Sequence, residues 1–257
     1  MATKLPRDYQ DYRKTLPLRR RTAIMFMDSG GARGRVAARS QAGLMRGVRE
    51  MDRAEHWEHV YGARQATQVS WYAPHLERSI AMIRTAADVS AEIIDVGGGA
   101  STLVDDLLAL GCTKVSVLDV STAALAVARE RLGAQAGMVT WIAGDVTSMR
   151  LPTEAYDVWH DRAVFHFLTE PADRRAYVDL AAASVKPGGH AILAAFSLEG
   201  PSRCSGLDVV RYNAENLSRE LAPAFALKQE TPESHRTPSG AEQKLIYCLF
   251  ERTSGAG

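Results

Sequence analysis

The chain alternates between short apolar segments that suit β-strands and segments with the apolar spacing of helices, and this alternation constrains the fold most. Strand-like segments occupy residues 92–96, 114–120, 139–146, 155–161 and 190–196. A strand that returns to its sheet through a helix forms a parallel pair, and each crossover covers one face of the sheet. The pattern predicts an α/β fold with a Rossmann-like, doubly wound, mostly parallel sheet.

Capping signals mark the helices between these strands. Ser121 precedes the helical sequence TAALAVARERL, which ends at Gly133, and Pro171 stands at a favoured first position of a helix that runs up to the sequence KPGG. Another helix begins near Ser101, and a last one is expected around 208–221.

The end of the chain breaks the alternation. The segments AFALKQETPESHR and KLIYCLFER are joined by TPSG, a turn sequence with proline and glycine. Two strands joined so closely pair in an antiparallel hairpin, because a parallel pair needs a longer crossover. We therefore expect the sheet to end in an antiparallel hairpin.

Composition sets the class of protein. The 257 residues suffice for one large α/β domain. The apolar runs are too short for a membrane helix, and the start of the chain lacks the apolar core of a secretory signal. Cys112, Cys204 and Cys248 are too few and too scattered for a disulfide framework or a paired-cysteine zinc site. A soluble cytoplasmic protein without membrane association or a metal site is expected.

Charge separates the first 50 residues from the rest. Residues 1–50 carry twelve Lys or Arg against four acids, whereas residues 51–257 carry nineteen against twenty-six. The sequence SGGARGRVAARSQAG has little apolar periodicity, which favours a basic, disordered extension over 1–50 and a folded domain over 51–257. A nucleic-acid arm, an organelle presequence and a functional chain that begins at Met51 are the alternatives.

Acidic residues stand at the ends of successive strands. Asp95 lies at the end of the first strand, Asp119 ends the second and Asp145 the third. His160 and Asp161 end the fourth strand. Ligands of open α/β sheets bind beyond the carboxyl ends of the strands, so these side chains are candidates for a site. Coincidence is the alternative, because aspartate is common at strand ends and helix caps.

The sequence IIDVGGGAST argues against a dinucleotide. The phosphate-binding pattern GxGxxG would require glycine at Thr102, and a pyrophosphate would be repelled by Asp95. No tyrosine precedes a lysine by four positions, as short-chain dehydrogenases require. S-adenosylmethionine has no phosphate and carries a sulfonium and an ammonium, which a carboxylate attracts. Asp119 could accept both ribose hydroxyls, and Asp145 with the N–H of Val146 could receive the adenine edge.

The motifs DVGGGAS, VLDVS, AGDV, DVWHDRAVFHFL and VKPGGHAIL, followed by a hairpin, resemble the class I S-adenosylmethionine-dependent methyltransferases over residues 55–252. The stretches HWEHVYG, VSWY and GPSRCSGLDVVRY are similar to a group of bacterial methyltransferases of undefined acceptor. The resemblance implies cofactor binding by Asp95, Gly97, Gly98, Gly99, Asp119, Val120, Asp145 and Val146, with Asp95 and the glycines at the methionine end. Many members have glycine in place of Ser101, which is where this chain departs from the pattern.

Methyl transfer needs alignment of the reactants and, for a neutral acceptor, a base. Asp161 and His166 follow the fourth strand, beside the expected position of the methyl group, and either could be the catalytic base. His166 could instead be packed in a turn, and Asp161 could pair with Arg162. Cys204 is expected to line the acceptor pocket or to be inert.

Aromatic residues before the sheet, Trp57, Tyr61, Trp71 and Tyr72, could form a lid whose faces favour a sulfonium, although core packing is the more usual role. The fourth strand lacks the Asn or Asp before Pro-Pro of adenine and glutamine methyltransferases, so nucleic-acid acceptors are not expected. We predict methyl transfer from S-adenosylmethionine to a small molecule. The alternatives are a protein side-chain methyltransferase, an NAD(P)-dependent reductase and a cofactor-binding regulator.

Overall fold

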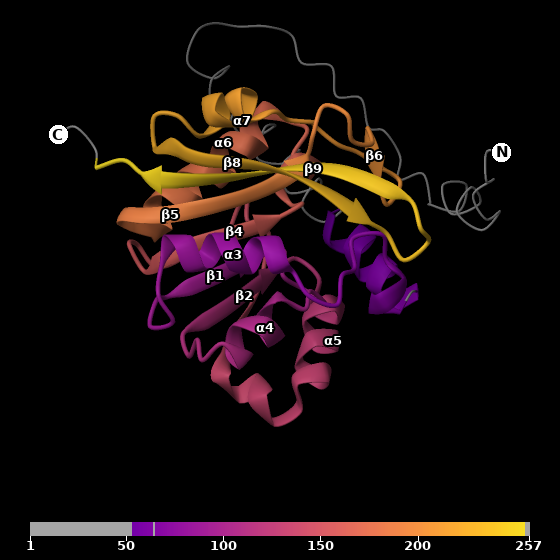
Figure 1. Ribbon diagram of the computed structural model, residues 1–257. Helices are drawn as coiled ribbons and strands as arrows, with labels where there is room; N and C mark the ends of the chain where they lie inside the picture. The colour runs from indigo at the N-terminus through magenta and orange to yellow at the C-terminus, as the bar shows by residue number, and fades with distance from the viewer. Residues whose placement is uncertain (1–52, 64, 255–257) are drawn as a thin grey trace, which may run out of the picture. The chain divides into compact units, whose positions relative to one another are not determined.

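A computed structural model describes residues 53–63 and 65–254 of the chain (Figure 1). Segment 1–50, for which an extension was predicted, lies outside the described residues. The described part contains a seven-stranded sheet and a separate two-stranded hairpin. Among these residues, no helix combines the length and the apolar character that a bilayer crossing requires.

The large sheet has the spatial order β3-β2-β1-β4-β5-β9-β8. Its strands are β1 (Ile93–Val96), β2 (Val115–Asp119), β3 (Val139–Ala143), β4 (Tyr156–Arg162), β5 (Val185–Phe196), β8 (Phe225–Arg236) and β9 (Glu242–Arg252). Strands β1 to β5 pair in parallel, and β9 runs antiparallel to β5 and to β8. The predicted fold class, a doubly wound sheet with a terminal hairpin, is confirmed. The strand order reverses between β1 and β4, the position at which such sheets bind ligands.

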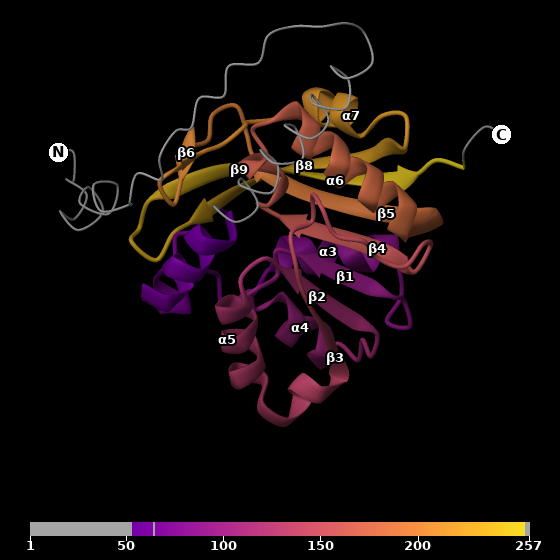
Figure 2. The same cartoon turned by 180° about the vertical axis from the view of Figure 1, so that it is seen from behind.

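Helices cover both faces of the sheet (Figures 1 and 2). One face carries α3 (Glu77–Ala86), α4 (Leu103–Ala109) and α5 (Thr122–Leu132), and the other carries α6 (Pro171–Ser184) and α7 (Ala214–Leu221). Because side chains alternate along a strand, Ile93 packs into one core and Ile94 into the other. Both are fully buried, as expected for a strand covered on both faces.

A helix over 53–63 precedes the sheet, and three short 3₁₀ helices complete the described elements. These are η1 (Ala66–Gln68), η2 (Gly133–Met138) and η3 (Phe165–Phe167). The helix over 53–63, drawn in indigo, lies beside the start of α5 in both views (Figures 1 and 2).

The predicted caps are present. Ser121 Oγ accepts a hydrogen bond from the N–H of Ala124 at 3.1 Å, and Gly133, with φ of 56°, ends α5. Pro171 occupies the first turn of α6. In the terminal hairpin, Pro232 lies in β8, the edge strand of the sheet, where a missing N–H is tolerated.

Three elements depart from what their local sequence favours. Helix α3 begins only at Glu77, because Pro74 disfavours helical backbone in the residue before it. A helix was expected around 208–221, but α7 forms only in the second half of this range, after the capping side chain of Asn213. The preceding residues form the short hairpin of β6 (Arg203–Cys204) and β7 (Leu207–Asp208). The sequence KPGG belongs to β5 at an irregularity in its pairing with β4.

Candidate active site

The carboxyl ends of β1, β2 and β3 border two adjoining hollows at one edge of the sheet. The large hollow encloses about 940 Å³ together with its mouth, and the small hollow about 470 Å³. Of the predicted cofactor residues, the large hollow is lined by Gly97, Asp119, Val120, Asp145 and Val146, and the small hollow by Asp95, Gly97 and Gly98.

The glycine turn after β1 (residues 97–99) lets two carboxylates approach the backbone closely. A Cβ on Gly98 would lie 2.4 Å from Oδ2 of Asp95, and a Cβ on Gly99 would lie 2.4 Å from Oδ2 of Asp119. Gly99 borders neither hollow, so its lack of a side chain serves to make room for the Asp119 carboxylate.

Gly97→Ala is expected to lower the free energy of unfolding by about 2 kcal/mol more than Gly111→Ala does. Gly97 has φ of +68°, and its new Cβ would lie 2.0 Å from Val164 Cγ2. Gly111 has φ of +89° but open space around the added atom, so it reports the backbone strain alone. Urea unfolding of both variants measures the difference, and equal losses would contradict the close approach of Val164.

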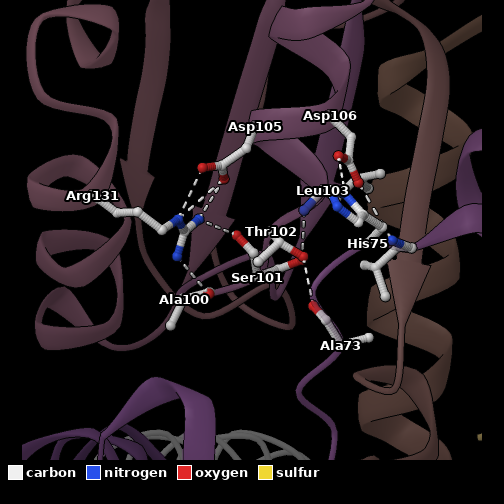
Figure 3. Close-up of polar contacts among 10 residues, drawn as sticks. Ala73, His75, Ala100, Ser101, Thr102, Leu103, Asp105, Asp106 and Arg131 are labelled. Carbon is white, nitrogen blue, oxygen red and sulfur yellow. Dashed lines mark hydrogen bonds and ion pairs between the residues drawn. The ribbon is translucent and has the colours of Figure 1, made fainter.

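The end of the glycine turn is held from two sides (Figure 3). The guanidinium of Arg131, on α5, donates to the carbonyl oxygens of Ala100 at 3.0 Å and Ser101 at 2.6 Å. Thr102 Oγ1 donates to the carbonyl oxygen of Ala73 at 2.8 Å. These contacts fix one wall of the small hollow without a glycine at Ser101, the position where the sequence departs from the family pattern.

Asp119 is a buried acid that faces the large hollow. It is 6% exposed, and its Oδ1 accepts a hydrogen bond from the N–H of Ser121 at 2.8 Å. Burial, together with repulsion from Asp95 and Glu58, raises the pKa of Asp119 to about 7. A strongly perturbed acid in the wall of a hollow is a typical feature of a functional site.

Asp119→Asn is expected to make the stability of the unliganded protein less dependent on pH. The folded state holds the Asp119 proton up to about pH 7, whereas the unfolded carboxyl loses it near about pH 4. This contribution to stability is therefore complete below about pH 4 and is lost as the pH rises through about 7. Between about pH 5 and pH 8 this group should lower the free energy of unfolding of the wild type by about 3 kcal/mol. The variant should not show this decrease.

Urea unfolding of wild type and Asp119→Asn at these two pH values measures the effect. Asp179→Asn, which removes an exposed acid from α6, controls for the loss of a surface carboxyl. Identical pH dependence of wild type and Asp119→Asn would contradict the raised pKa.

Among the described residues, one carboxylate oxygen of Asp95 has a hydrogen-bond partner and the other has none. Its Oδ1 lies 2.7 Å from Nδ1 of His160, and its Oδ2 is buried without a hydrogen-bond partner among the described residues. His160 Nε2 lies 2.9 Å from Ser79 Oγ, which in turn lies 3.4 Å from the hydroxyl oxygen of Tyr247. A buried carboxylate oxygen without a partner is costly, so it marks a place where a ligand donor would be stabilised.

Asp145 is held by Arg53, a residue that sequence reasoning missed. Arg53 donates to Asp145 Oδ2 at 2.8 Å, to Asp173 Oδ2 at 2.9 Å and to Thr147 Oγ1 at 2.8 Å. Thr147 also donates to Oδ1 of Asp145 through both its N–H and its hydroxyl. Arg53 is separated from its partners by about a hundred residues, so no local pattern indicates this cluster.

The helix over 53–63 covers the large hollow with aromatic side chains. Trp57 and Tyr61 line this hollow together with Trp71, and the ring centroids of Trp57 and Trp71 are 5.7 Å apart. Glu58 accepts hydrogen bonds from the N–H groups of Thr122 and Ala123 at the start of α5. These aromatics pack on one another and form part of the wall of the hollow, and their role as a lid stays a prediction. Tyr72, the fourth predicted aromatic, lines the small hollow.

Asp161, a predicted catalytic residue, is fully buried and borders neither hollow. Its carboxylate accepts hydrogen bonds from the N–H groups of Val164 at 2.7 Å and Phe165 at 3.0 Å, and from the Tyr177 hydroxyl at 2.6 Å. Burial raises its pKa to about 6. These bonds hold the turn after β4. Asp161 does not pair with Arg162, because the side chain of Arg162 lies on the opposite face of the strand.

His166, the other predicted catalytic residue, is also fully buried and borders neither hollow. Its Nδ1 accepts a hydrogen bond from the N–H of Phe196 at 3.3 Å. Burial and the nearby Arg162 cation lower the pKa of His166 to about 3. A neutral imidazole with so low a pKa is a weak base near neutral pH.

Comparison with known proteins shows which proteins this chain resembles. The family model described as a methyltransferase domain matches residues 93–189. A ubiquinone/menaquinone biosynthesis C-methyltransferase from Methylobacterium nodulans is 31% identical over 121 residues. Residues 93–189 therefore resemble the methyltransferase domain of class I S-adenosylmethionine-dependent enzymes. The chain aligns with the relative over 46% of its own length and spans about half, 47%, of that relative.

Solved structures agree with this methyltransferase fold. A chain associated with conversion of a disulfide bond into a thioacetal group during echinomycin biosynthesis matches with a TM-score of 0.65 and 18% identity, over 79% of this chain and 93% of that one. The glycopeptide N-methyltransferase MtfA in complex with S-adenosylmethionine matches with a TM-score of 0.55 and 18% identity, over 70% and 87%. At these identities the matches establish the fold.

S-adenosylmethionine, the cofactor of class I methyltransferases, fits the residues present. The free Oδ2 of Asp95 offers an acceptor to a cationic donor beside the small hollow. A Cβ on Gly98 would lie 2.4 Å from this oxygen, so the glycine turn keeps the carboxylate close to the backbone. Asp119 adds a second carboxylate in the large hollow. Two acids beside a glycine turn suit a phosphate-free, positively charged nucleoside.

Proposed function

We propose that the methyltransferase transfers the methyl group of S-adenosylmethionine to a small-molecule acceptor. The observation that carries the proposal is the aromatic part of the wall of the large hollow. Trp57, Trp71, Phe167 and Phe196 line it, and Trp57 comes from the helix over 53–63. A covered aromatic hollow suits a small apolar body, whereas a side chain on a folded protein needs an open approach.

The cofactor residues take the roles that their positions favour. Asp119 accepts the ribose hydroxyls, Asp95 pairs with the ammonium through its free oxygen, and Asp145 with the N–H of Val146 faces the adenine edge. The glycines at 97–99 keep the backbone close to the methionine end. When bound, S-adenosylmethionine supplies a methyl group on a good leaving group, so the work of the protein is mainly alignment.

The turn after β4 positions the acceptor wall. Asp161 anchors the N–H groups of Val164 and Phe165, and the neighbouring Phe167 lines the large hollow. We assign Asp161 and His166 this positioning role in place of proton removal, because both are buried away from the hollows. An acceptor that reacts as a thiolate, a phenolate or a neutral amine needs no carboxylate in this wall.

The test combines binding with transfer of label. Calorimetry should detect S-adenosylmethionine and no NADPH, since the glycine turn lacks the phosphate pattern. Incubation with methyl-labelled donor and mixed thiols, phenols, amines and carboxylic acids should label small molecules. A parallel incubation with intact proteins should leave the protein fraction unlabelled. Label that enters only the proteins would overturn the proposal in favour of a side-chain methyltransferase.

A further inference from the structure

Arg162 is a buried cation that no cofactor role uses. It ends β4, its side chain is 8% exposed, and it lines both the large and the small hollow. Its Nε donates to the Tyr247 hydroxyl at 3.0 Å, and its Nη1 donates to the carbonyl oxygen of Trp71 at 2.9 Å. Both of these partners are neutral, so they orient the guanidinium without balancing its charge.

The nearby carboxylates leave this charge incompletely balanced. Glu233 lies 3.9 Å from Nη2 of Arg162, at the outer limit of an ion pair, and also 3.9 Å from Nε of Arg78. One carboxylate therefore serves two guanidinium groups. Burial also raises the pKa of Glu233, which disfavours its charged form.

Among the residues that the structure describes, the other titratable groups near Arg162 do not supply the missing charge. Asp161 accepts from the backbone and Tyr177, on the opposite face of β4. Asp95, in the small hollow, lies against His160 and offers its free oxygen to the cofactor ammonium. The pKa of His235 is lowered by burial and by Arg162, which favours the neutral imidazole beside the guanidinium.

The surroundings of Arg162 in the large hollow are apolar and aromatic. Trp71, Phe196 and Leu245 line the same hollow, and Tyr247 and Glu233 come from the hairpin of β8 and β9 on the side away from the glycine turn. A desolvated guanidinium binds a carboxylate through two parallel charge-assisted hydrogen bonds more strongly than an exposed one does. Arg53, the other cation that lines this hollow, is already paired with Asp145 and Asp173. An apolar wall beside a buried, incompletely balanced cation is complementary to an apolar body with one anionic group.

We propose that the acceptor is a small aromatic or apolar carboxylic acid whose carboxylate binds Arg162 in the large hollow. This inference rests on the proposed function and adds the chemical class of the acceptor. The guanidinium fixes the acid at the hairpin side of the hollow, while the aromatic wall holds its body towards the glycine turn. The cofactor also carries a carboxylate, so the test must separate these two sources of the same chemistry.

The experiment measures binding without turnover, in the presence of saturating S-adenosylhomocysteine. Calorimetry compares benzoate and cinnamate with their neutral amides, benzamide and cinnamamide. Wild type should bind the acids at least about tenfold more tightly than the amides. Arg162→Gln should remove this preference and Arg162→Lys should keep part of it. Arg78→Gln is the matched control, since it removes the other, exposed partner of Glu233, and it should leave the preference unchanged.

Three outcomes would overturn the inference. The first is a wild type that binds acids and amides equally, which needs no variant and is independent of folding. The second is an Arg162→Gln variant that retains the preference. The third is an Arg162→Gln variant that loses affinity for S-adenosylhomocysteine instead, which would assign the guanidinium to the cofactor carboxylate.

Failure of this inference differs from failure of the proposed function. Transfer of label to small molecules without preferential binding of acids leaves the function and removes the Arg162 site. Preferential binding of acids without label on any small molecule leaves the acid site and removes the function.

Discussion

Asp119→Ala is expected to weaken S-adenosylmethionine binding by about 10²-fold to 10⁴-fold. The carboxylate is proposed to accept both ribose hydroxyls, and each hydrogen bond to a charged group contributes about 1.5–3 kcal/mol. The fold should persist, because within the protein this side chain accepts from little more than the N–H groups that follow β2.

Titration calorimetry gives the affinity, and circular dichroism with a melting curve reports the fold. Asp179→Ala removes an exposed acid from α6 and should bind the cofactor like wild type. An unchanged affinity in Asp119→Ala would remove the ribose assignment. A variant that fails to fold would show that the carboxylate is structural.

Asp161→Ala is expected to lower the free energy of unfolding by about 3–5 kcal/mol. The substitution leaves two backbone N–H groups and the Tyr177 hydroxyl buried without their acceptor, and each such group costs about 1–3 kcal/mol. When the variant is assayed well below its melting temperature, its loss of turnover, expressed as a free energy, should be smaller than this loss of stability.

Tyr177→Phe is the comparison variant: it removes one donor to the carboxylate, which keeps its two backbone partners, and it removes the acceptor of Trp159 Nε1. Its cost should be about 1–2 kcal/mol. Urea unfolding measures both variants. If Asp161→Ala kept wild-type stability but lost turnover more than about 100-fold, the original assignment of Asp161 as a base would be restored.

The sequence predicts the sheet well because its signals are local. Ser121 and Gly133 delimit α5 through contacts within one helical turn, and the isoleucine pair at 93 and 94 indicates a strand buried on both faces. The acids at strand ends could likewise be placed at one rim, because parallel strands share a direction. Secondary-structure periodicity therefore suffices for the fold and for the side of the sheet that carries the site.

The orientation of side chains around the site could not be predicted in the same way. Asp161 and Arg162 are neighbours in sequence, yet they face opposite sides of β4 and have unrelated partners. Arg53 and Glu233 reach the site from segments far apart in the chain. Which face of a strand meets a hollow depends on long-range packing, which periodicity along one strand leaves undetermined.

The acids around the two hollows also affect how long the protein survives in a cell. The free oxygen of Asp95 and the buried carboxyl of Asp119 destabilise the empty protein, and a bound cation relieves that penalty. Marginally stable proteins are removed by proteases in proportion to how often they unfold. We therefore expect the empty molecules to be degraded first when the methyl donor is scarce, so that abundance follows the supply of donor.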